Sequence, residues 1–130
     1  MPFTVERLQN EPIIVITWSD PPNAAKDMPE SWKEIDRRIR PDESGVYTIS
    51  DLRNLTIDFA SIVSGMTLQQ EQRPGAANDP RVHSILVGSG ILWEIVSKGA
   101  KQFKRAGMEL PLFATMEEAL AHAREKIKSW

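Results

Sequence analysis

Two charged side chains directly follow a predicted strand, where they could contact a ligand or a partner. Asp51 and Arg53 come after the predicted strand 46–50, and open α/β sheets place ligand-contacting groups at the carboxyl ends of their strands. The structural alternative is a surface ion pair or a turn cap formed by the same two residues. Such pairs and caps are more frequent than binding sites, so the sequence favours the structural role.

Ser61 is a candidate for regulatory modification in the segment that follows. Asp58 is typical of a helix N-cap, because its carboxylate can accept a hydrogen bond from a free N–H group of the first turn. Ser61 then falls within that turn, where a phosphate would gain from the free N–H groups and from the helix dipole. An ordinary first-turn serine is the favoured alternative.

Small residues mark a second candidate site between a predicted strand and a predicted helix. Gly88, Ser89 and Gly90 could present backbone N–H groups to a phosphate or a carboxylate. A dinucleotide fingerprint would need glycine where Trp93 stands, and a Walker loop would need a lysine and a hydroxyl that are absent here. A tight turn is therefore the favoured interpretation, and anion binding is the alternative.

The sequence offers little support for catalysis or metal binding. It has no cysteine and two histidines, His83 and His122, which do not form a metal-ligand pattern. We expect His83 to be a satisfied sheet residue and His122 to be solvated. A triad of Ser89, His83 and Asp51 would lack the Gly-x-Ser-x-Gly elbow that positions a nucleophile. We therefore expect no catalytic residues, no metal and no cofactor, and enzyme activity through Asp51, His83 or Arg53 is the least supported function.

Length and composition predict one globular domain and argue against nucleic-acid binding and membrane insertion. A chain of 130 residues with 41% hydrophobic and 26% charged residues predicts one globular domain over residues 1–130. The formal net charge of −2 gives no overall attraction to nucleic acid. No apolar run reaches the roughly 20 residues that span a bilayer, and the first residues do not form a secretory signal. We expect a cytoplasmic protein without membrane insertion.

The hydrophobic pattern predicts strands that alternate with helices. Two β-favouring runs, 3–8 and 13–18, are separated by a polar turn and predict a hairpin. A helix and three further strand–helix units follow, and right-handed crossovers make their strands parallel. The expected fold is α/β, in the order ββαβαβαβα, with a mixed, mostly parallel sheet of about five strands and four helices.

Capping signals place the ends of the first and last helices. The first helix is expected to begin at the cap Asp27, with Pro29 in its first turn. Its buried stripe recurs at helical spacing and comprises Met28, Trp32, Ile35 and Ile39. The last helix is expected to begin with a capping box made by Thr115 and Glu118. Its inward stripe ends at Trp130.

This order and several short segments resemble the STAS or SpoIIAA-like family, which includes the anti-sigma-factor antagonists. The segments are Asp51-Leu52-Arg53-Asn54, the helix from Asp58, the Val87-Gly88-Ser89-Gly90 turn, and the run from Leu112 to Leu120. Phospho-regulated members carry a serine or threonine near the start of the helix after the third strand, in an Asp-Ser-Ser-Gly-like sequence. Alignment on Asp58 places Phe59 and Ala60 there. Alignment on residues 51–54 places Ser61 there, followed by Ile62 instead of glycine. The resemblance is to a branch without an intact phosphoacceptor motif.

The resemblance implies a non-enzymatic regulatory protein-interaction module of the signalling type. Its contact face would be formed by the segment from Asp51 to Ser61 and the helix from Leu92, with a protein partner or a second copy of the chain. The alternative is a small-molecule or lipid-binding domain, which would hold an apolar or anionic ligand between helices and sheet. The candidate pocket residues are Trp18, Phe59, Met66 and Trp93.

Overall fold

The computed structural model describes residues 3–19, 24–54, 74–76, 79–88, 90, 94 and 111–130. These ranges contain the following elements in chain order: β1 (Phe3–Arg7), β2 (Ile13–Trp18), α1 (Ala24–Arg38), β3 (Val46–Asp51), β4 (Val82–Val87), β5 (Leu112–Phe113) and α4 (Met116–Ile127). The strands and the first and last helices of the expected order are therefore confirmed. The second and third expected helices fall outside the described residues.

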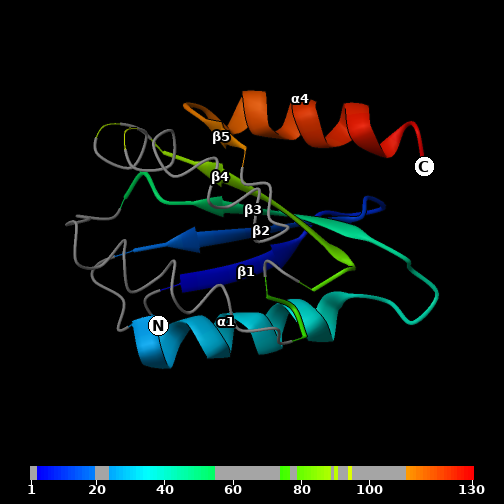
Figure 1. Ribbon diagram of the computed structural model, residues 1–130, viewed down its shortest axis with the longest axis horizontal. Helices are drawn as coiled ribbons and strands as arrows, with labels where there is room; N and C mark the ends of the chain where they lie inside the picture. Colours follow the sequence, from blue (N-terminus) through cyan, green and yellow to red (C-terminus); the bar gives the residue numbers. More distant parts are fainter. Residues whose placement is uncertain are drawn as a thin grey trace.

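The strands form one mixed sheet in the order β1-β2-β3-β4-β5 (Figure 1). The hairpin is confirmed, because β1 and β2 pair antiparallel with Phe3 opposite Trp18. The other pairs are parallel, and β3 aligns Asp51 with Thr17 on one side and with Val87 on the other. The carboxyl ends of β2, β3 and β4 therefore meet at one edge of the sheet.

Alternating side chains of the strands form a core on each face of the sheet. On one face, Ile14, Ile16 and Val46 pack with the α1 residues Trp32 and Ile35. The opposite face carries Ile13, Ile49, Ile85 and Val87 against the small α4 residues Ala119 and Ala123. Figure 1 shows α1 beside the β1 edge and α4 beside the β5 edge. The continuous apolar run of β2 is explained by burial on both faces.

The first helix begins earlier than the sequence predicts. It runs from Ala24, so Asp27 lies in its first turn and the expected cap at Asp27 is wrong. Pro29 consequently lies inside the helix. Alanine has the strongest helix propensity, and with Ala24 and Ala25 at its start the helix begins about one turn before the expected first residue, Met28. The predicted stripe is confirmed, because Trp32, Ile35 and Ile39 are buried and Met28 packs against them.

The last helix begins at the predicted capping box. Thr115 is the N-cap, and its hydroxyl oxygen accepts a hydrogen bond from the Glu118 backbone N–H at 3.2 Å. The Glu118 carboxylate in turn accepts a bond from the Thr115 hydroxyl at 3.1 Å, whereas a standard capping box would bond it to the backbone N–H. Trp130 is 55% exposed, so its expected inward orientation is only partly correct. It does stack on Tyr47, with ring centroids 5.6 Å apart.

Candidate functional site

Asp51 and Arg53 form an ion pair with two side-chain hydrogen bonds at the carboxyl end of β3. Asp51 is buried, and its Oδ1 accepts hydrogen bonds from the backbone N–H of Arg53 at 3.1 Å and from Arg53 Nε at 2.9 Å. Its Oδ2 accepts a bond from Arg53 Nη2 at 2.8 Å. The ion pair and turn cap that the sequence favours are both confirmed, and they are made by the same carboxylate.

This pairing fixes the charge of Asp51. Hydrogen bonds from the Arg53 side chain lower the pKa of Asp51, and this effect outweighs burial, which raises it. The Arg53 backbone N–H and the positive charge of Arg53 lower the pKa further. Asp51 is therefore a carboxylate at neutral pH and does not serve as a proton reservoir. The Arg53 side chain is 45% exposed and the Asp51 side chain 6%, so Arg53 is the member of the pair that reaches solvent.

The end of β4 lies beside this pair. The Leu52 N–H donates to the Val87 carbonyl at 2.9 Å, and the Gly88 N–H donates to the Phe113 carbonyl at 3.0 Å. The Gly88 N–H is therefore used within the sheet and is not available to an anion. Gly90 is exposed and has a φ of 66°, a left-handed conformation that suits a tight turn and favours glycine. Ser89 lies outside the described residues.

The remaining candidates from the sequence lie in the core or fall outside the described ranges. Trp18 is buried in the core on the α1 face, where its ring lies 5.2 Å from that of Phe3. The other proposed pocket residues lie outside the described ranges: Phe59, Met66 and Trp93. The same holds for the candidate regulatory residues Asp58 and Ser61.

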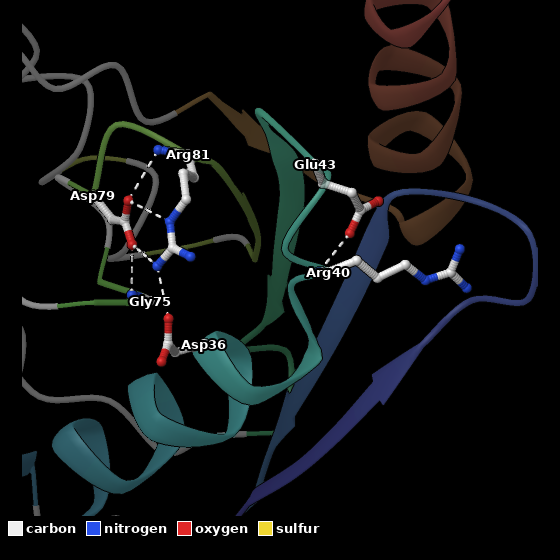
Figure 2. A network of polar contacts seen from close by, with 6 residues as sticks. All are labelled: Asp36, Arg40, Glu43, Gly75, Asp79 and Arg81. Carbon is white, nitrogen blue, oxygen red and sulfur yellow. Dashed lines mark hydrogen bonds and ion pairs between the residues drawn. The ribbon is translucent and has the colours of Figure 1, made fainter.

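A second aspartate–arginine pair, which sequence reasoning missed, lies before β4. The Asp79 carboxylate accepts bonds from the backbone N–H groups of Gly75 at 2.8 Å and Arg81 at 2.9 Å. It also binds Nε and Nη2 of Arg81, at 3.2 and 2.7 Å. Arg81 Nη2 reaches Asp36 of α1 at 2.7 Å as well. Figure 2 shows Arg81 between the two aspartates.

The environment of Asp79 strongly favours its charged form. Burial raises the pKa of this carboxyl group, but the bonds from the Arg81 side chain and from the backbone N–H groups of Gly75 and Arg81 outweigh burial. The net effect lowers the pKa from 3.8 to about 2. The repeated Asp-x-Arg spacing in Asp51-Leu52-Arg53 and Asp79-Pro80-Arg81 is the signal that could have revealed this pair.

Both histidines lie around Tyr47 in an aromatic cluster. His83 stacks on Tyr47 with ring centroids 5.1 Å apart, and His122 meets the edge of Tyr47 at 6.4 Å. His122 is half-buried and also contacts Phe113, so the expectation that it is solvated is wrong. His83 is an exposed residue of β4 that packs on rings. Within the described ranges, no group of three or more acidic, histidine or cysteine residues could hold a metal ion.

No described helix combines the length and apolar character needed to cross a membrane.

Comparisons with known proteins identify the fold. No family model matches the sequence, and no curated protein matches it significantly. An uncharacterized DUF3478-family protein from Shewanella loihica PV-4, described as having a SpoIIAA-like fold, has a similar structure. The TM-score is 0.57 at 14% identity, over 93% of this chain and 91% of that one. An anti-sigma factor antagonist from Mycobacterium paratuberculosis is also similar, with a TM-score of 0.57 at 14% identity, over 94% and 92% of the two chains. These matches, together with the mixed sheet described above, show that the chain has a STAS or SpoIIAA-like fold.

Proposed function

We propose that the chain is a non-enzymatic regulatory module that binds a protein partner through the carboxyl end of β3. The observation that carries the proposal is the likeness to an anti-sigma factor antagonist over 94% of the chain, because that protein's name describes regulation through protein contacts. One domain over residues 1–130, acting in the cytoplasm, is part of the proposal.

The chemistry of the described site supports binding more than catalysis. Asp51 is held as a carboxylate by Arg53, so it is a poor general acid or base at neutral pH. The Arg53 guanidinium is fixed by two bonds to Asp51, from Nε and Nη2, and the Arg53 side chain is 45% exposed. A fixed, partly exposed arginine is suited to recognition, because arginine is enriched at protein interfaces. Ser61, close to this site in the sequence, stays a candidate for regulation of the contact.

Site-specific photo-crosslinking tests the proposal. A photoreactive amino acid at Asn54, which is exposed beside the ion pair, is compared with the same amino acid at Lys33 on α1, whose side chain is 69% exposed. We expect position 54 to crosslink in cells to a defined protein, and the complex to form again from the two purified proteins. A second copy of this chain as the crosslinked protein would identify a homodimer.

The proposal is wrong if position 54 gives no crosslinked protein beyond those seen from position 33. It is also wrong if the crosslinked protein and this chain, both purified and folded, do not associate at micromolar concentration.

A further inference from the structure

Two of the three Asp-x-Arg sequences, at 51–53 and 79–81, fold into the same local structure at opposite ends of the parallel strands, whereas the third, at 36–38, lies in α1. In both, one aspartate oxygen accepts bonds from the backbone N–H and Nε of the arginine two positions later. The other oxygen accepts a bond from Nη2, at 2.8 Å in one motif and 2.7 Å in the other. Both aspartates are buried, with 5% exposure for Asp51 and 7% for Asp79. The arginine side chains are similarly exposed, at 45% for Arg53 and 37% for Arg81.

The two motifs differ in whether the arginine binds a second carboxylate. Arg81 binds Asp36 in addition to its own aspartate. Within the part of the chain that the structure describes, Arg53 pairs with Asp51 and with no other carboxylate. A guanidinium has five N–H donors, and Asp51 occupies donors on Nε and Nη2 only. On Arg81, one nitrogen, Nη2, binds both Asp79 and Asp36. The corresponding donor on Arg53 is therefore the second N–H of Nη2.

We propose that Arg53 binds an acidic side chain of a protein partner, in the position that Asp36 occupies on Arg81. This inference rests on the proposed function and names the chemistry of its contact. Arg81 shows that the motif accepts a second carboxylate while keeping its first. Asp51 already holds the guanidinium in place, so little side-chain entropy is lost when the second carboxylate binds.

The charge of the motif favours a carboxylate over a phosphate group. Asp51 and Arg53 together carry no net charge, and Asp51 lies on the neighbouring side of the same guanidinium. The cost of desolvating an anion grows with the square of its charge, whereas its attraction to the motif grows only in proportion to the charge. A motif without net charge therefore favours a carboxylate with a charge of −1 over a phosphate group with a charge near −2. The partner segment is therefore expected to be rich in aspartate or glutamate.

A titration with a capped hexaglutamate peptide tests the contact without knowledge of the partner. The arginine Nε–H signals of ¹⁵N-labelled protein are followed by NMR at low salt. We expect a saturable shift of the Arg53 signal, and a much smaller shift of the Arg81 signal, because Asp36 already occupies that site. Arg53→Lys keeps the charge but loses the planar fork, so we expect roughly tenfold weaker binding, about 1.4 kcal/mol.

Arg37→Lys is the matched control. The Arg37 side chain is 71% exposed and pairs with Glu34 on α1, and we expect this variant to bind the peptide like the wild type. Arg53→Gln provides a second variant without charge, and the dispersion of the backbone amide signals verifies that each variant is folded. The inference is overturned if Arg53 and Arg37 shift alike, if the Arg53 signal does not saturate, or if inorganic phosphate binds Arg53 more tightly than the peptide.

The two proposals fail in different ways. If a purified partner binds equally well to the wild type and to Arg53→Lys, the proposed function stands and the carboxylate contact is wrong. If hexaglutamate binds at Arg53 but photo-crosslinking from position 54 finds no protein, the contact chemistry stands and the proposed function is wrong.

Discussion

Asp79 connects a loop, a strand and a helix through one carboxylate. Its oxygens accept bonds from the backbone at Gly75 and Arg81, and the Arg81 side chain extends the contact to Asp36 of α1. Because the carboxylate is buried and fully bonded, its loss leaves N–H groups without acceptors. An unsatisfied buried donor costs about 1–3 kcal/mol. A substitution of Asp79 should therefore lower the free energy of unfolding by more than a substitution at an exposed ion pair.

Asp79→Asn is expected to lower the free energy of unfolding by about 2 kcal/mol at pH 7. The folded-state pKa of about 2 lies below the ordinary 3.8, so this stabilisation is fully present above pH 3.8 and is lost as the pH falls toward 2. The difference between wild type and variant in urea unfolding should therefore shrink across that interval. Asp36→Asn, at a side chain that is 43% exposed, is the control and should cost below about 1 kcal/mol. An equal effect of both variants, or a difference that does not change with pH, would contradict the expectation.

At the scale of elements, the approach of residues 74–76 to α1 depends on a glycine. Gly75 has a φ of 84°, and a Cβ atom there would overlap the backbone carbonyl of Trp32 and lie 3.1 Å from the Asp36 nitrogen. Helix backbone cannot move aside as a flexible side chain can. Only glycine at position 75 therefore lets the segment lie this close to α1, and the same residue donates its N–H to Asp79.

Gly75→Ala should lower the free energy of unfolding by at least about 3 kcal/mol, because left-handed backbone strain and steric overlap add together. Gly90→Ala is the matched control. It has a φ of 66° but no heavy atom within 4 Å of the added Cβ, so about 1 kcal/mol of backbone strain is expected. Thermal and urea unfolding of both variants measure the difference. Equal losses would show that position 75 has room for a side chain.

Across the whole molecule, Arg7 connects the edge strand to the loop between α1 and β3. Its guanidinium binds Glu43 through Nη1 and Nη2, at 2.7 and 2.6 Å, and Nη1 also donates to the Arg38 carbonyl at the end of α1. The bonds from Arg7 lower the pKa of Glu43 and outweigh the opposing effect of burial. Glu43 also accepts a bond from the Arg40 backbone N–H at 2.8 Å (Figure 2). These contacts hold β1, α1 and β3 in one arrangement.

A double-mutant cycle with Arg7→Ala and Glu43→Ala measures this connection. Both side chains are mostly buried, with 15% and 17% exposure, so we expect a coupling free energy of about 1–3 kcal/mol. The same cycle at Arg37 and Glu34, a pair within α1 whose arginine is 71% exposed, should give a clearly smaller coupling free energy, because solvent screens the pair. Urea unfolding of the single and double variants provides the values. A coupling at Arg7 and Glu43 no larger than that within α1 would show that the connection contributes little.

The sequence by itself determined the order of the described elements and the nature of their buried faces. Local signals sufficed for β2, whose apolar residues are continuous, and for α4, whose cap at Thr115 lies next to the helix it begins. The start of α1 was misplaced, because the capping tendency of Asp27 competed with the helix propensity of the alanines before it. The ion pair of Asp51 and Arg53 could be predicted because its partners are two residues apart.

Only the tertiary structure decided the contacts between residues distant in the sequence. Arg81 and Asp36 are separated by 45 positions, and Arg7 and Glu43 by 36, so no local pattern indicates which charges meet. The gathering of both histidines around Tyr47 likewise depends on the register of β3 and β4 and on the packing of α4. Periodicity tells which face of an element is buried, whereas the pairing of strands and helices determines which side chains on those faces come into contact.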